Sequence, residues 1–112
     1  RIIGAMHPVN PQPLAALRVV EFAHVIAGPF AGLQLQQLGA QVTKVEPPAG
    51  GDYLASLAHG QRAYAALNHA KTVRAIDLKT ADGLAEARAL VDAADVLIDS
   101  YRPGVLQRLG LD

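Results

Sequence analysis

The cations in the second half of the sequence have residue types and positions suited to binding an anion. Lys79 directly follows an apolar segment, and Arg102 and Arg108 lie around the N-terminus and first turns of a predicted short helix that opens at Pro103. Guanidinium groups bind phosphates bidentately, and the amides at a helix N-terminus favour an anion. These three cations therefore predict a phosphate-binding crevice. The alternative is that they are surface side chains in contact with water.

Acidic residues and histidines are the candidates for ligand binding or proton transfer. Glu46 ends a predicted strand roughly 20 residues after a glycine-containing turn, where nucleotide-binding folds place a ribose-binding carboxylate. A solvent-exposed carboxylate is the alternative. Asp52 is expected to bond nearby backbone amides, and Asp99 is expected either to face a ligand or to pair with Arg102. His24 is the best-placed general base, but no candidate nucleophile lies beside a base, so spacing alone assigns no catalytic residue.

The segment "HVIAGPFAG", residues 24–32, has the two glycines and the proline of a candidate ligand-binding turn. A turn of this kind between a strand and a helix often holds a phosphate. Three residues separate Gly28 from Gly32, however, so the dinucleotide fingerprint G-x-G-x-x-G cannot be written over the turn. Phe30 and Tyr101 are aromatic residues near the predicted turns, and either could stack on an adenine or fill the core.

The composition limits the classes of partner. Ten Lys and Arg balance ten Asp and Glu, which argues against a general attraction for nucleic acid or an acidic membrane. The sequence has no cysteine, and its four histidines show no H-x-x-x-H spacing, so no metal site is expected. No stretch approaches the roughly 20 apolar residues of a membrane span. We therefore expect a soluble, cytoplasmic protein.

Apolar segments and helical patterns alternate along the chain. Strands are predicted over residues 17–23, 41–46, 72–78 and 95–99. Helices are predicted over residues 31–38, 61–67 and 81–93 and after Pro103, with Pro29 in a first turn, Gly39 at a helix end and Thr80 as an N-cap. This alternation predicts an α/β fold with a parallel, doubly wound sheet. Residues 1–13 are expected to be a leader outside the fold, and the ending at "RLGLD" suggests the start of a larger protein.

Three segments together resemble the opening of a known enzyme family. They are "RVVEFAHVIAGPFAGLQLQQLGAQVTKVEPPAGGD", "LNHAKTVRAIDLKTADG" and "ADVLIDSYRPGVLQRLGLD". In this order they resemble class III CoA-transferases, the CaiB/BaiF family, which includes formyl-CoA transferase, carnitine CoA-transferase and α-methylacyl-CoA racemase. The resemblance extends from Leu14 to Asp112.

The resemblance implies that residues 14–112 are the N-terminal part of a large Rossmann-like domain that binds coenzyme A. It also implies an interlocked homodimer, CoA thioester and carboxylic acid substrates, and catalytic residues beyond position 112, so that this chain alone would be inactive. The family's transferases use an aspartate, and its racemases use a His and Asp pair. Position by position, the implied CoA contacts are Ile26, Ala27, Ile76, Asp77, Leu78, Lys79, Ser100, Tyr101, Arg102 and Arg108.

The sequence departs from the family pattern at three places. "GGDYLAS" lacks the arginine of the family's "GGDPxR", Pro47 stands where some relatives have a CoA-contacting arginine, and "NHAKTV" keeps Lys71 but lacks two further cations. These departures imply a weaker attraction for phosphate than is typical. A stand-alone, non-catalytic nucleotide-binding module remains the alternative from another class. A fragment of an NAD-dependent oxidoreductase is a third, against which the missing fingerprint argues.

Overall fold

The computed structural model describes residues 12–112, so the expected leader at residues 1–13 lies almost wholly outside the described residues. Four parallel strands form one sheet in the order β3-β2-β1-β4. They are β1 (Arg18–Phe22), β2 (Gln41–Glu46), β3 (Thr72–Ala75) and β4 (Val96–Asp99). The helices are α1 (Ala27–Gln37), α2 (Tyr53–Ser56), α3 (Gly60–Asn68), α4 (Ala81–Asp92) and α5 (Val105–Arg108). The predicted parallel, doubly wound α/β fold is confirmed.

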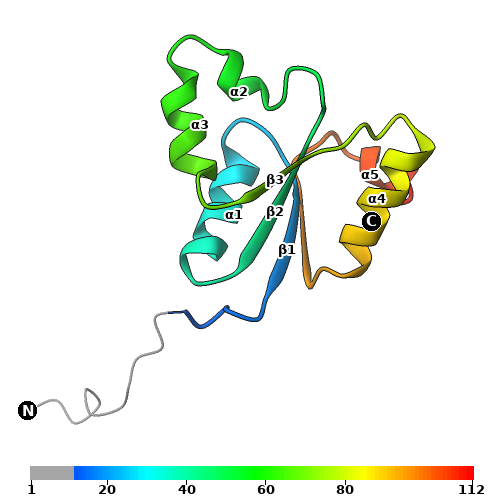
Figure 1. Ribbon diagram of the computed structural model, residues 1–112, viewed down its shortest axis with the longest axis horizontal. Coiled ribbons are helices and arrows are strands. Elements are labelled where there is room, and N and C mark those ends of the chain that lie inside the picture. Colours follow the sequence, from blue (N-terminus) through cyan, green and yellow to red (C-terminus); the bar gives the residue numbers. More distant parts are fainter. Residues whose placement is uncertain (1–11) are drawn as a thin grey trace, which may run out of the picture.

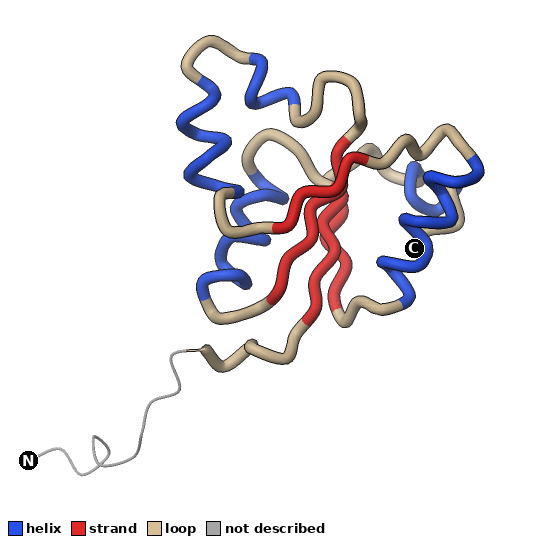
Figure 2. The backbone as a smooth tube through the Cα atoms, in the orientation of Figure 1, coloured by secondary structure: helices blue, strands red, loops and turns tan. Residues whose placement is uncertain are grey.

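The helices cover the sheet from both sides: α1 and α3 lie on one side, and α4 and α5 lie on the other (Figures 1 and 2). The central strands β1 and β2 are largely buried, as near-continuous apolar segments of a parallel sheet should be. Successive side chains point to opposite faces. Phe22 therefore packs with Ala87 of α4 and Leu106 of α5, whereas Val19 packs with Leu35 of α1.

Several predicted helix ends are confirmed by their local chemistry. The Thr80 hydroxyl accepts a hydrogen bond from the Gly83 amide at 3.0 Å and so caps α4. Gly39 follows α1 with a φ of +106°, a left-handed conformation that glycine adopts without steric cost. Helix α1 begins at Ala27, before the predicted start at residue 31, because Pro29 is compatible with a first helical turn.

Other boundaries differ from the prediction. Strand β3 ends at Ala75 rather than at residue 78, because Asp77 starts a turn in which its carboxylate accepts from the Lys79 amide at 3.0 Å. Helix α2 was not predicted at all. Helix α5 begins at Val105, after Gly104 with a φ of +85°. Arg108 is therefore the last residue of a single helical turn, within the first turn of the helix as expected.

Candidate functional site

Two adjoining cavities open at the carboxyl ends of the strands. The larger, of about 310 Å³, is lined by Ala23, His24, Val45, Glu46, Pro47, Gly51, Asp52, Tyr53 and Tyr101. The smaller, of about 150 Å³, is lined by Val45, Glu46, Pro47, Ile76, Asp77, Leu78, Lys79 and Tyr101. Open α/β sheets bind ligands at this edge, where the strand order changes direction. Here the change falls between β1 and β4, which His24 and Tyr101 follow.

The structure brings five of the ten implied contact residues to these cavities. Ile76, Asp77, Leu78, Lys79 and Tyr101 line the smaller one, and Tyr101 also borders the larger. The other five line neither cavity: Ile26, Ala27, Ser100, Arg102 and Arg108. Of the three cations expected in one crevice, Lys79 lines the smaller cavity, whereas Arg102 and Arg108 are exposed and line neither. Binding of a phosphate by all three cations stays a prediction.

Tyr101 forms an aromatic wall between the two cavities. Its ring packs edge-on against Phe22, with centroids 6.2 Å apart, and lies 5.7 Å from the His24 ring. Burial, with a smaller contribution from Asp99, raises the pKa of Tyr101, so its hydroxyl stays protonated and can donate a hydrogen bond. Tyr53 also lines the larger cavity and is 62% exposed. Sequence reasoning missed Tyr53, although it directly follows the "GGD" turn.

The acidic residues near the cavities are engaged by protein groups. Glu46 is only 8% exposed and accepts a hydrogen bond from the Tyr64 hydroxyl at 2.6 Å, so the alternative of a solvent-exposed carboxylate is wrong. Burial and Glu46 raise the pKa of Tyr64, which keeps this donor protonated. Asp99 accepts from the Tyr101 amide at 2.9 Å. Within residues 12–112 no ion pair joins Asp99 to Arg102.

Asp52 has the loop-orienting role that its sequence predicts. Its Oδ1 accepts from the amides of Val25 and Leu54, each at 2.9 Å, so it caps α2 and ties that helix to the turn before α1. Burial alone would raise the pKa of Asp52, but these two amides and Lys44 outweigh it and hold the pKa below its ordinary value.

Beneath α1 lies a buried charge cluster, which we define as Glu21, Lys44, Asp52 and Lys71. Lys71 Nζ lies 2.7 Å from Glu21 Oε1, and Lys44 Nζ lies 3.2 Å from Glu21 Oε2 and 2.9 Å from Asp52 Oδ2. Burial lowers the pKa of Lys71, and Glu21 opposes that shift. The resemblance suggested that Lys71 could be a phosphate-attracting cation. This is wrong, because Lys71 is 9% exposed and already bound.

The glycines of the turn that precedes and begins α1 serve packing against the sheet. A Cβ on Gly28 would overlap the side chain of Ala23 and lie 3.1 Å from that of Ser100. A Cβ on Gly32 would overlap Glu21 Oε1. Both positions need glycine because α1 approaches β1 so closely. The glycines therefore make room for α1 and for the charge cluster.

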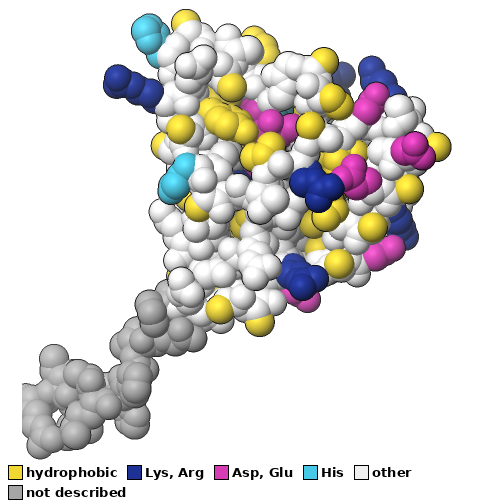
Figure 3. Space-filling model, viewed as in Figure 1, with side chains coloured by type: hydrophobic (Ala, Val, Ile, Leu, Met, Phe, Trp, Pro, Cys, Tyr) yellow, Lys and Arg dark blue, Asp and Glu magenta, His cyan; other side chains and the backbone are white. Residues whose placement is uncertain are grey.

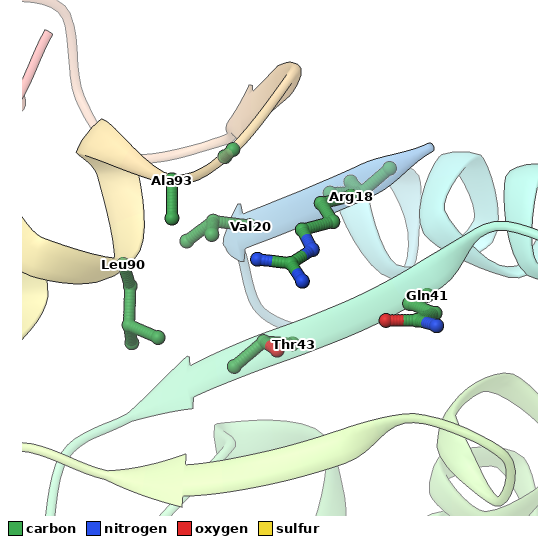
Figure 4. Close-up of a pocket in the computed structure, with 8 residues that line it drawn as sticks. Arg18, Val20, Gln41, Thr43, Leu90 and Ala93 are labelled. Carbon is green, nitrogen blue, oxygen red and sulfur yellow. The ribbon is translucent and has the colours of Figure 1, made fainter. Parts of the chain in front are cut away.

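A third cavity, of about 200 Å³, lies at the opposite end of the strands (Figure 4). Arg18 and Gln41 begin β1 and β2, Leu90 lies in the last turn of α4, and Ala93 directly follows that helix. This edge faces the C-terminus of α4, where the helix dipole disfavours an anion. The third cavity is therefore a poorer candidate for an anionic ligand than the two at the carboxyl edge.

On the face that Figure 3 shows, basic and acidic side chains are interspersed, and most of them lie in the centre and on the side of α4 and α5. Among residues 12–112, no group of three or more His, Asp or Glu side chains is placed to hold a metal ion. In the same residues, no helix has the length and apolar character needed to cross a membrane.

Comparison with known proteins gives the chain its family. The model of CoA-transferase family III matches residues 14–112. The chain is 41% identical to the CoA-transferase/lyase DddD of a Marinomonas species, covering 96% of this chain and 12% of that protein. It is 41% identical to a succinate–glutarate CoA-transferase of Agrobacterium fabrum, covering 94% of this chain and 29% of that protein.

The same fold is present in a solved structure. A crystal structure of a CaiB/BaiF family protein from Brucella suis matches with a TM-score of 0.82 and 37% identity, over 91% of this chain and 29% of that one. The chain thus spans less than a third of the length of each of these relatives. The family model and the solved structure each match nearly all of the described residues. The chain therefore belongs to CoA-transferase family III.

Proposed function

We propose that residues 14–112 are the N-terminal part of a Rossmann-like, coenzyme A-binding domain. The whole protein would be a class III transferase that moves CoA between an acyl-CoA and a carboxylic acid. The observation that carries the proposal is the pair of adjoining cavities at the carboxyl edge of the sheet, which five of the implied contact residues line. We also propose that the whole protein is a cytoplasmic homodimer that binds neither nucleic acid nor a membrane.

The chemistry of the larger cavity suits a planar base. Tyr101, His24 and Tyr53 border it, and aromatic rings stack favourably on one another. Lys79 borders the smaller cavity, where the turn that Asp77 stabilises presents an ammonium group. A cation next to an aromatic cavity fits a ligand that joins an adenine to phosphates.

The remaining implied residues are proposed to contact parts of CoA that extend beyond the cavities. Ile26 follows β1, beside the point where the strand order changes, and is 57% exposed. Its side chain can therefore contact a ligand without a rearrangement of the core. Arg102 and Arg108 are exposed cations on the segment that follows β4. Their free guanidinium groups can reach a phosphate that lies outside the sheet edge.

The transfer chemistry itself is proposed to lie outside residues 1–112. His24 lines the larger cavity, yet its closest described partners are the ring of Tyr101 and, through its backbone amide, Ser100 Oγ at 3.3 Å. Neither partner forms a nucleophile and base pair with His24. We therefore assign CoA binding to this chain, and we assign the catalytic aspartate or the His and Asp pair to the rest of the protein.

Calorimetric titration of CoA into the intact protein tests the proposal. Lys79→Ala and Arg108→Ala should each weaken binding roughly ten- to a hundredfold, because each removes a charge-assisted hydrogen bond. Arg108→Lys should recover part of the affinity, since an ammonium keeps the charge but not the planar fork. Arg62→Ala, at an exposed cation of α3, is the matched control and should leave binding unchanged.

Two results would contradict the assignment. An intact protein that binds no CoA would refute the proposed ligand, and folded Lys79 and Arg108 variants that bind as tightly as the parent would refute the proposed contacts. Activity separates the alternatives. A transferase passes CoA to an added carboxylic acid, a racemase exchanges the proton next to the thioester carbonyl with deuterated water, and a non-catalytic module does neither.

A further inference from the structure

We infer that the buried charge cluster is a positioning device for the turn after β1 together with the first turn of α1, residues 23–30, and that ligand binding at the carboxyl edge depends on it. The statement about the ligand rests on the proposed function, and the statement about the turn rests on geometry alone. The cluster itself lies beneath α1, and only Asp52 also borders the larger cavity.

The four charges form an alternating chain. Lys71 contacts Glu21, Glu21 also contacts Lys44, and Lys44 contacts Asp52, so each charge has an opposite neighbour. None of the four side chains is more than 1% exposed. Ions withdrawn from water are tolerated only with well-placed partners. Another arrangement of the segments that carry these four residues would leave a buried charge without its partner, so the cluster holds those segments in one arrangement.

These segments are far apart in the sequence. Glu21 lies in β1, Lys44 in β2, Asp52 in the loop before α2, and Lys71 directly before β3. Glu21 and Lys44 are cross-strand neighbours in the register of β1 and β2. The cluster thus joins the two central strands to the loop that borders the larger cavity and to the start of the edge strand.

Three hydrogen bonds connect the cluster to the backbone of the turn. Lys44 Nζ donates to the carbonyl of Ala23 at 2.6 Å, at the start of the turn. The Val25 amide donates to Asp52 Oδ1 at 2.9 Å. Lys71 Nζ donates to the carbonyl of Pro29 at 2.8 Å, inside the first turn of α1. Both ends and the middle of the turn are therefore held by buried charged groups.

The turn needs this support because its backbone is strained. Val25 has a φ of +67°, in the left-handed region that a β-branched residue rarely adopts. Such a conformation persists only where the surroundings impose it. His24, which borders the larger cavity, precedes Val25, and the proposed contacts Ile26 and Ala27 follow it. The positions of all three depend on the conformation of Val25.

A charge-balanced pair of substitutions separates positioning from stability. In the intact protein, Glu21→Gln leaves Lys71 without an opposite charge, and Lys71→Met leaves Lys44 as the one cation between two buried carboxylates. Both single substitutions should therefore lower the melting temperature and the CoA affinity. The double variant removes one charge of each sign, and its glutamine can still accept from Lys44. We expect the melting temperature of the double variant to return toward that of the parent.

The CoA affinity should not return with it. Without Lys71 the carbonyl of Pro29 loses the hydrogen bond from the ammonium group, so we expect affinity to stay about tenfold below that of the parent. Hydrogen exchange of a peptide that spans residues 23–31 should be faster than in the parent. The exposed pair of Arg74 and Glu86, on the opposite face of the sheet, provides the control. Arg74→Met with Glu86→Gln should change neither the affinity nor the exchange.

A second pair of variants remains informative if the double variant does not fold. Asp52→Asn keeps an oxygen that accepts from Val25, whereas Asp52→Ala does not. We expect Asp52→Asn to keep the slow hydrogen exchange of the parent in residues 23–31, and Asp52→Ala to exchange about tenfold faster there, because the Val25 amide loses its acceptor. Equal effects of the two substitutions would overturn the inference.

The failure of the inference and the failure of the proposed function give different results. A double variant that recovers melting temperature, CoA affinity and slow exchange together would show that the cluster only stabilises the fold. A parent that binds no CoA would refute the proposed function, and the exchange measurements would still decide the role of the cluster in the turn.

Discussion

Replacing Gly32 by alanine should destabilise the protein, although helix propensity alone predicts the opposite. Gly32 lies inside α1, where alanine is favoured over glycine by about 1 kcal/mol. The added Cβ would overlap Glu21 Oε1 and lie 3.1 Å from Lys71 Nζ, so the carboxylate must move away from its lysine. Overpacking costs about 1–3 kcal/mol, and breaking a buried ion pair costs about 3–5 kcal/mol. With partial loss of the pair, we expect a net destabilisation of about 2–4 kcal/mol.

Urea unfolding followed by circular dichroism measures this effect on the parent and on two variants. Ala31→Gly is the matched control, because Ala31 is the exposed neighbour of Gly32 on the same helix. The control should lose about 1 kcal/mol from propensity alone. Both substitutions should therefore destabilise the protein, although they exchange the same two residue types in opposite directions. A Gly32→Ala variant more stable than the parent would refute the close approach of α1 to Glu21.

The remaining predictions concern a helix cap and the response to acid. Thr80→Ala should lower the free energy of unfolding by about 1 kcal/mol, because the Gly83 amide loses its acceptor, whereas Thr80→Ser should retain most of it; equal losses in urea unfolding would contradict the cap. Because the pKa of Asp52 is lowered from 3.8 on folding, its contribution to stability is complete above pH 3.8 and is lost as the pH falls through the folded-state value. Asp52→Asn should therefore show a shallower loss of stability below pH 3.8, and an unchanged acid slope would mean that Asp52 does not titrate in this way.

The family and the general fold could be predicted from the sequence because their signals are local. The apolar residues of β1 and β2, the Thr80 cap and Gly39 each act within a few residues of the chain, so short-range patterns report them. The implied contacts from Ile76 to Lys79 are also contiguous. They reach the smaller cavity together because one segment leaves the edge of the sheet there. Local patterns missed α2, whose single turn is too short to show a helical period.

The tertiary structure alone decided which charged residues meet. Fifty positions separate Lys71 from Glu21, and only the order β3-β2-β1-β4 with its register brings Lys71, Lys44 and Glu21 under α1. The same arrangement buries Lys71, so that it cannot bind a phosphate as its motif suggested. It also leaves Arg108 outside the cavities. A sequence records the charge of a residue, but its partner and its contact with water depend on how separate strands pair. This is why the sequence determined the family and the order of its elements, and only the folded sheet determined which cations remain free to bind a ligand.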